Sequence, residues 1–368
     1  MTEKHVLSAV VAAVVALGIA QHAVVAKEYS YRPASVSFFP PLSTNGIESG
    51  DVSTSFSLNI VGGYLGRLSG VELGGVFNIE SDDAFGYQAA GAVNIVGKDF
   101  TGVQQAGAVN VVGGDVRILQ QAGAVSVAAG SVVGVQMAGA VSVAGSDVNG
   151  AQISGAVNLA GGRVHGLQMA GAVNIANEFR GAQIGVVNIA GEGRGLQLGV
   201  VNIAGDVDVP IGLLSIVKNG QFHVNVWASE FSLVNLGIKT GSKTIYNVFM
   251  FGCQPGGDST RLLAGLGIGG HIPLNRFFVD IDALSHNLWR GPEWFVEGGP
   301  NLLSSLRLTG GWQLTDMLAL TAGPALNVWV SDREDGSAIP VYDAPLFHWE
   351  RDVNVRIWPG FTVGLQLL

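Results

Sequence analysis

Apolar and polar residues repeat at a fixed spacing between Gly70 and Val217. The recurring motif consists of a Gln, a short Ala-Gly-Ala-like segment, and an Asn or Ser that lies between two aliphatic residues. The Asn or Ser recurs every 16 residues from Asn78 to Asn174 and then every 14 residues as far as Asn202. Self-similarity at a short fixed period is typical of stacked-repeat folds. The repeat therefore predicts the architecture of this half of the chain.

A second polar register of glutamines runs through the same repeats. Its first members are Gln88, Gln104, Gln120, Gln136, Gln152 and Gln168, which keep the 16-residue spacing. Stacked parallel strands place identical amides one above another, where they pair into ladders. We therefore expect both the Asn/Ser and the Gln positions to form ladders along the array.

Residues within each unit alternate with a period of two. Val173 and Ile175 alternate with Asn174 and Ala176, a pattern typical of short β-strands. From this alternation we expect the branched residues to form the core. They are Val93, Ile95, Val109, Val111, Val125, Val127, Val141, Val143, Val157, Leu159, Val173, Ile175, Val187, Ile189, Val201 and Ile203. Parallel rungs of a β-solenoid and antiparallel strands of a meander or barrel both fit the alternation.

The change of period favours the solenoid. Loss of one residue inside a continuous strand would turn every later side chain to the opposite face, whereas a corner tolerates the loss. Gly171, Gly185 and Gly199 stand where such corners are expected. We predict an all-β chain with lead-in strands over 27–69 and a parallel β-solenoid of 16- and then 14-residue rungs over 70–217.

Longer alternating segments follow residue 218. They place aliphatic residues on one face and polar or small residues on the other, and all seven tryptophans lie among them. We predict roughly eight or nine antiparallel strands over 218–368, with turns at 273–275, 314–316 and 358–360. This pattern is typical of outer-membrane β-barrels. A soluble barrel or sandwich with an apolar core is the alternative.

The N-terminus has the pattern of an export signal. Lys4 precedes an apolar run from Val6 to Ala20, and Val24-Val25-Ala26 offers small residues for cleavage. The run is shorter than the ~20 residues that a spanning helix needs. We therefore predict a signal peptide over 1–26, with a retained N-terminal anchor as the alternative. The net charge of -9 leaves no basic surface, so nucleic acid is not an expected partner.

Residues suited to catalysis or metal binding are sparse. Asp280 and Asp282 share a strand face and would line a lumen or, as the least favoured hypothesis, serve an envelope hydrolase. The histidines lack metal-ligand spacing. Cys253 is the only cysteine and has no histidine near it in sequence. We predict no enzyme activity, no catalytic residues, no metal site and no cofactor.

A solenoid face that repeats one amide is a candidate ligand-binding surface. The residues concerned are Gln104, Gln120, Gln136, Gln152 and Gln168, and a polysaccharide or a protein would be the partner. The favoured alternative is that these amides only fix the register of the rungs, because the small residues around them leave little relief for a pocket.

The chain resembles a known family of bacterial surface-repeat proteins, first noted in leptospires and common in Bacteroidetes-like genomes. The segments that carry the resemblance are Ser37-Phe38-Phe39-Pro40-Pro41-Leu42-Ser43-Thr44-Asn45-Gly46, Phe56-Ser57-Leu58-Asn59-Ile60-Val61-Gly62-Gly63-Tyr64 and the Gly-x-Gln-x-Ala-Gly-Ala-Val-Asn-Ile units. The C-terminal segments 320–328 and 358–364 resemble outer-membrane barrel strands. The resemblance implies an outer-membrane or cell-surface location and no catalytic residues.

These observations together lead to one expected function. The chain is expected to be a non-enzymatic structural protein of the cell envelope, exported and associated with the outer membrane. The alternative is a secreted or periplasmic solenoid that binds polysaccharide or a protein partner through its amide ladder.

Overall fold

The computed structural model describes residues 27–255, 260–290, 301–331, 346–350 and 353–367. The chain divides into two compact units between Ala204 and Gly205. The predicted signal peptide lies outside the described residues.

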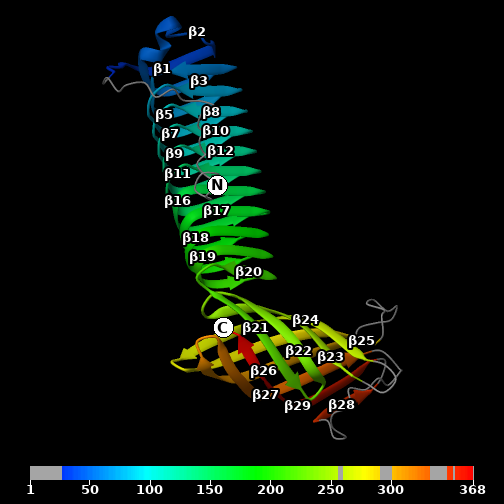
Figure 1. The fold of residues 1–368 in the computed structure, drawn as a ribbon. Helices are drawn as coiled ribbons and strands as arrows, with labels where there is room; N and C mark the ends of the chain where they lie inside the picture. The colour runs from blue at the N-terminus through cyan, green and yellow to red at the C-terminus, as the bar shows by residue number, and fades with distance from the viewer. Residues whose placement is uncertain (1–26, 256–259, 291–300, 332–345, 351–352, 368) are drawn as a thin grey trace. The chain divides into compact units, whose positions relative to one another are not determined.

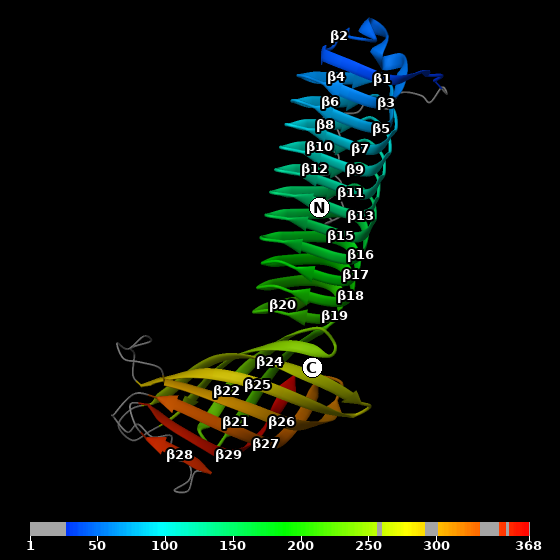
Figure 2. The ribbon, with the colours of Figure 1, turned by 180° about the vertical axis from the view of Figure 1, so that it is seen from behind.

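The first unit is a parallel β-solenoid built from two stacks of strands (Figure 1). One stack contains β1 (Ser30–Phe39), β3 (Val52–Asn59), β5 (Arg67–Gly74), β7 (Ala84–Ala90), β9 (Phe100–Ala106), β11 (Val116–Ala122), β13 (Val132–Ala138) and β15 (Val148–Ser154). The other contains the shorter strands β4 (Gly62–Leu65), β6 (Phe77–Glu80), β8 (Val93–Val96), β10 (Val109–Val112), β12 (Val125–Ala128) and β14 (Val141–Ala144). Each rung contributes one strand to each stack, as Figure 2 shows from behind.

Later rungs run through both stacks without a break in the strand. They are β16 (Val157–Ala170), β17 (Val173–Ile184), β18 (Val187–Leu198) and β19 (Val201–Ile211), which is followed by β20 (Leu214–Val217). At the N-terminal end, β2 (Leu42–Ser43) and the 3₁₀ helix η1 (Gly46–Asp51) precede β3. Because β1 pairs in parallel with β3, and β3 with β5, the stack already includes strands that the sequence suggested were a lead-in.

The strand register confirms the solenoid and the role of its corners. Gln104 pairs with Gln120, and Gln120 with Gln136, so each rung repeats its neighbour. The offset falls from 16 to 15 residues between Ala160 and Arg163, and to 14 between Met169 and Val173. The first loss falls at an irregularity inside β16, where the strand passes from one stack to the other, and the second falls between β16 and β17, so the facing of the side chains is kept.

Most of the predicted core of the solenoid was wrong, because the two faces of its short strands are exchanged; of the predicted set, Val127, Val143 and Leu159 are buried and the others are half-buried. Asn94 and Val96 are fully buried, whereas Val93 and Ile95 lie on the outer face and are half-buried. The rest of the interior is filled by alanine, valine and phenylalanine residues from other positions. These include Val96, Phe100, Val112, Val116, Ala128, Val132, Ala144, Val148, Ala160 and Val164. Amides can occupy an interior when they satisfy one another's hydrogen bonds, and alternation alone does not reveal which face turns inward.

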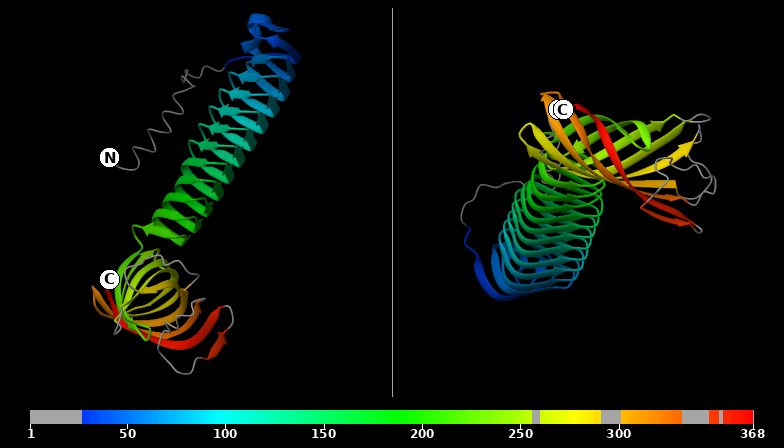
Figure 3. Two further views of the ribbon diagram at one scale, coloured as in Figure 1. Left: turned by 90° about the vertical axis from the view of Figure 1, so that its right-hand side faces the viewer. Right: turned by 90° about the horizontal axis from the view of Figure 1, so that it is seen from below.

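The second unit contains a closed antiparallel β-barrel of eight strands. The strands are β21 (Gln221–Ser229), β22 (Ser232–Gly241), β23 (Ile245–Gln254), β24 (Arg261–Leu274), β25 (Phe277–Arg290), β26 (Asn301–Thr315), β27 (Leu318–Ser331) and β29 (Asn354–Leu367). Pairing of β21 with β29 closes the sheet, and the short β28 (Phe347–Glu350) adds to β29 outside the ring (Figure 3). The strand number agrees with the sequence prediction.

The two ends of the barrel differ in their connections. At one end the turns are short, at 242–244, 275–276 and 316–317, and β21 begins and β29 ends there. At the other end three of the connections are longer, over 255–260, 291–300 and 332–346. The turn predicted at 358–360 was wrong, because these residues lie within β29, where Pro359 faces outward and is exposed.

Candidate functional site

Among the side chains that the structure describes, the outer face of the barrel wall carries no charged residue on β25, β26 or β27. Its outward positions on these strands are Phe277, Val279, Ile281, Ala283, Ser285 and Asn287, then Leu302, Ser304, Leu306, Leu308, Gly310 and Trp312, and then Leu320, Ala322, Pro324, Leu326, Val328 and Val330. Many of the large ones are highly exposed, as Leu306 at 54% illustrates. Phe277 and Trp312 stack with ring centroids 6.3 Å apart near the short-turn end. The strand period places the opposite set of side chains in the lumen.

The lumen holds the charged residues that the outer face lacks. The Lys239 ammonium, only 3% exposed, donates to Asp280 Oδ2 across 2.6 Å. His271 Nδ1 lies 2.7 Å from Asp280 Oδ1, so both carboxylate oxygens have a partner. Lys239 also reaches Gln366 Oε1, at 3.3 Å. Four strands thus meet through one carboxylate and one ammonium group.

A second ion pair lies on the same interior face. Arg307 donates to Asp282 Oδ2 across 2.7 Å, and the Tyr246 hydroxyl donates to Asp282 Oδ1 across 2.5 Å. The Arg307 guanidinium carbon lies 4.6 Å from the centroid of the Trp227 ring. Buried charges are tolerated when they are paired and hydrogen-bonded in this way.

Apolar and aromatic side chains fill the half of the lumen nearer the long connections. The cluster comprises Phe231, Leu263, Leu288, Leu303, Trp329 and Trp358. The Trp358 indole N–H donates to Glu230 Oε1 at 3.0 Å, and the same oxygen accepts from Asn327. Trp329 donates to Asn301 Oδ1 at 2.8 Å. The polar tips of these aromatic residues are therefore satisfied within the barrel.

The described part of the lumen leaves little free space. A cavity of about 20 Å³ lies among Lys239, Asp282 and Arg307, which is room for about one water molecule. Eight-stranded barrels are just wide enough for side chains to fill them. The filled interior favours a plug of side chains over an open diffusion channel.

Asp280 and Asp282 line the lumen, as one sequence hypothesis held, but each is engaged by its own cation. The small cavity beside Asp282 offers no room for an organic substrate in the described part of the barrel. Cys253, at the end of β23, is partly exposed. Among the described residues, no group of three or more His, Cys, Asp or Glu is arranged to hold a metal ion.

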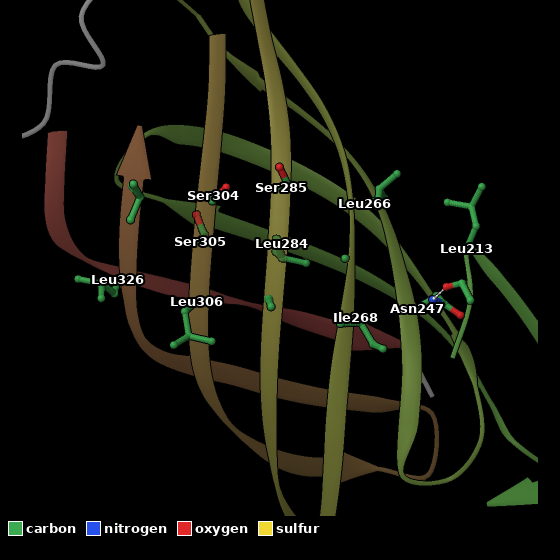
Figure 4. Close-up of a pocket in the computed structure, with 14 residues that line it drawn as sticks. Leu213, Asn247, Leu266, Ile268, Leu284, Ser285, Ser304, Ser305, Leu306 and Leu326 are labelled. Atoms are coloured by element: carbon green, nitrogen blue, oxygen red, sulfur yellow. Dashed lines mark hydrogen bonds between the residues drawn. The ribbon is translucent and has the colours of Figure 1, made fainter. Parts of the chain in front are cut away.

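A depression with a volume of about 550 Å³ lies on the barrel wall. Leu266, Ile268, Leu306 and Leu326 line it, and Figure 4 shows them with Leu213 beside the strands. The segment carrying Leu213 is held to the barrel through Asn247, whose amide donates to the Gly212 carbonyl oxygen at 2.6 Å. The lining is predominantly aliphatic, which suits contact with hydrocarbon.

The five glutamines predicted to bind a ligand lie inside the solenoid. Gln104, Gln120, Gln136, Gln152 and Gln168 are 0% exposed. Each donates its Nε2–H to the Oε1 of the preceding glutamine, as Gln136 does to Gln120 at 2.9 Å. A surface ligand does not reach them, so the idea of a presented ladder face needs correction. Their geometry is that of a structural ladder.

The asparagines form a second ladder with the opposite direction of donation. Asn78 donates to Asn94 at 3.0 Å, and Asn94 donates to Asn110 at 2.9 Å, toward the C-terminal rungs. Ser126 and Ser142 interrupt this ladder, which resumes when Asn158 donates to Asn174 at 3.0 Å. The side-chain oxygen Oδ1 of Asn158 has no hydrogen-bond partner, because the preceding rung supplies a serine in place of an asparagine.

A buried carboxylate pair at the N-terminal end of the Gln ladder was not predicted. Gln88 donates to Glu72 Oε2 at 3.1 Å and to Glu80, and Asn59 donates to Glu72 Oε1 at 2.8 Å. Burial, together with the adjacent Glu72, raises the pKa of Glu80 well above its ordinary value. The 16-residue spacing from Gln88 back to Glu72 was the available sequence signal, since it puts an acid in the Gln register.

The chain was compared with family models, with curated proteins and with solved structures, and nothing matches in any of the three. In the described part of the chain, no helix has the length and apolar character needed to cross a membrane.

Proposed function

We propose that the protein is a non-enzymatic structural protein of the outer membrane, anchored there by its barrel. The observation that carries the proposal is the polarity of the barrel wall. Charged groups such as Lys239, Asp280 and Arg307 lie in the lumen, while the outward positions of β25, β26 and β27 are uncharged and largely aliphatic. Lipid-facing barrels require this distribution.

The polarity argues against the soluble alternative. A soluble barrel would turn aliphatic residues to its core and leave charges on the outside. Here the apolar outer face extends over neighbouring strands, far beyond the scattered single residues that soluble surfaces carry. The aliphatic depression around Leu266 and Leu306 would be filled by acyl chains in a bilayer.

The ends of the barrel support an orientation for the solenoid. In outer-membrane barrels the short turns face the periplasm and the longer loops face the outside. The solenoid chain enters the barrel at the short-turn end, because β21 starts beside the 242–244 turn. We therefore place the solenoid on the periplasmic side, which refines the cell-surface location expected from the sequence.

Membrane insertion is tested by placing a charge on the barrel wall. Leu306→Arg puts an unpaired guanidinium in the apolar belt, which costs roughly 2–4 kcal/mol near the bilayer midplane. The wild-type chain should fractionate with outer membranes and migrate faster on gels before heating than after. The variant should lose a large share of this heat-modifiable form.

Met317→Arg is the matched control. Met317 is 72% exposed but lies in the 316–317 turn, at the end of the barrel wall. It should insert like the wild type. Recovery of the wild-type chain entirely in the soluble periplasmic fraction would defeat the proposal, and so would normal insertion of Leu306→Arg.

The orientation has a separate test on intact cells. Asn149, exposed on β15, is changed to Cys in a Cys253→Ser background. A membrane-impermeant maleimide should label it only after the outer membrane is opened. Labelling on intact cells would reverse the orientation without affecting the insertion result.

The alternative function, binding of polysaccharide or a protein through the Gln ladder, gains no support from the geometry. Gln136 and Gln152 are fully buried, and their amide groups are used within the ladder. No other observation favours that function.

A further inference from the structure

The outer face of the short-strand stack is aliphatic along the whole repeat array. Two columns of outward residues run from rung to rung on this face; Figure 2 labels several of the short strands that carry them. The first is Val93, Val109, Val125, Val141, Val157, Val173, Val187 and Val201, and the second is Ile95, Val111, Val127, Val143, Leu159, Ile175, Ile189 and Ile203. We call these two columns the aliphatic face.

The corner beside the aliphatic face is also uncharged. It consists of Gly-Ala pairs from Gly91-Ala92 to Gly171-Ala172 and ends in Gly185-Val186 and Gly199-Val200. Val186 is 47% exposed and Val200 is 45% exposed. The outer face of the long-strand stack is different, since it carries Arg117, His165 and Arg194. The face of the short strands is therefore uncharged, whereas the face of the long strands carries charged residues beside aliphatic ones such as Val133, which is 47% exposed.

This distribution is the reverse of what a sheet facing water needs. Such a sheet places apolar residues on its covered side and polar residues outside. In this stack the Asn and Ser side chains are inside, while the aliphatic side chains lie on the outer face, where Val127, Val143 and Leu159 are buried and the other members of the two columns are half-buried. Uncharged sheet faces of this extent mark interaction sites.

We infer that the aliphatic face is covered by the same face of a second copy of this chain. The face repeats at the spacing between stacked strands, ~4.8 Å, and a second solenoid of the same period matches this spacing rung for rung. A two-fold axis parallel to the stack would set equivalent rungs opposite each other, with the first column of one copy against the second column of the other. Such an interface is self-complementary.

The size of the face is sufficient for a dimer. Four-residue strands stacked over this array present roughly 500 Å² per copy. Pairing two copies therefore covers roughly 1,000 Å², near the lower bound for a specific interface, and the Gly-Ala corner adds to it. A lipid surface is the less suitable occupant, because interfacial elements use Lys, Arg and Trp and the two columns contain none.

The inference is tested on the purified full-length chain in detergent by sedimentation over a range of concentrations. We expect a dimer for the wild type, and at least a tenfold weaker dimer for Val157→Arg and for Val173→Arg, because a guanidinium would be buried without a partner. Val135→Arg is the matched control, since Val135 lies outward on β13 in the other stack. It should dimerise like the wild type.

Cross-linking of a milder variant covers the case in which an Arg variant misfolds. Val157→Cys in a Cys253→Ser background should give cross-linked dimer with a short bismaleimide, and Asn149→Cys, on the other stack, should not. A monomeric wild type, or dimers unaffected by both Arg variants, would overturn the inference. Equal cross-linking from both cysteines would overturn it as well. Heat-modifiable mobility, which reports barrel insertion, is scored separately, so failure here leaves the membrane proposal standing.

Discussion

The barrel and the solenoid both enclose polar side chains and turn aliphatic residues outward, but they satisfy their interiors in different ways. The barrel pairs unlike groups, as Lys239 does with Asp280 and Arg307 with Asp282. The solenoid pairs like groups, since each Gln bonds the Gln of the next rung. Unlike pairs are specific to one place in the fold, whereas like pairs can be repeated without limit.

This difference predicts how much stability each interior loses when one hydrogen-bonding or charged partner is removed. In the barrel, loss of one partner leaves an uncompensated charge. In the solenoid, loss of one amide leaves neutral groups without a partner, and those cost less. The following substitutions measure the two cases.

The largest effect is expected for Arg307→Leu. The Asp282 carboxylate would remain buried with only the Tyr246 hydroxyl as a strong partner, and breaking a buried ion pair in this way costs about 3–5 kcal/mol. Urea unfolding of the reconstituted barrel measures the loss. Adding Asp282→Asn should restore most of the stability. If Arg307→Leu alone is neutral, the lumen ion pair does not stabilise the barrel.

Gln136→Met tests the solenoid interior. The change removes a donor and an acceptor from the middle of the ladder, and we expect a loss of about 2–3 kcal/mol in the unfolding of the solenoid. Gln121→Met is the control, because Gln121 is exposed on the outer face of β11. Its effect should stay within about 0.5 kcal/mol. Equal effects would show that the buried ladder is no more important than a surface amide.

The third effect is a pH dependence of the solenoid's stability. The folded-state pKa of Glu80 is raised by burial and by Glu72, so its contribution to stability is present at low pH and is lost as the pH rises through that raised pKa. Unfolding measured from pH 5 to pH 9 should show stability falling by up to about 1.4 kcal/mol per pH unit. Glu80→Gln should remove the slope. If the stability of the wild type did not change with pH, this would contradict the raised pKa of Glu80.

The smallest expected effect is a gain in the stability of the solenoid when Ile118 is replaced. This residue has φ of 92°, whereas the equivalent positions in neighbouring rungs are glycines, Gly102 and Gly134, with φ of 139° and 123°. A β-branched residue in this region is strained, so Ile118→Gly should stabilise the solenoid by about 1 kcal/mol. Leu119→Gly, one residue later on β11, should destabilise it. Thermal unfolding distinguishes the two variants. A loss of stability in both of them would contradict the idea that the backbone at Ile118 is strained.

The period and the corners of the solenoid were predictable because both depend on spacing. The change from 16 to 14 residues had to fall at bends, and glycines such as Gly171 and Gly185 indicated where. The facing of the strands was not predictable in the same way. Val93 and Asn94 alternate equally well in either orientation, and the usual assignment of aliphatic residues to the core fails when amides pair with their own copies.

In the barrel, too, the sequence predicted only part of the structure. Its strands follow from alternation, and Asp280 and Asp282 were correctly given one common face. Their partners Lys239 and Arg307 were not predicted, because they come from other strands and only the closed sheet brings them together. Pro359 suggested a turn, yet it lies within β29 with its ring facing outward.

The rung-for-rung register gives the molecule an adjustable length. Because every rung pairs with copies of itself, insertion or removal of one complete 16-residue unit in the middle of the array would leave both ends and all remaining ladders unchanged. The reach of the solenoid would change in steps of ~4.8 Å. Duplication of whole repeat units within the gene can therefore change the length of the solenoid while both of its ends stay the same.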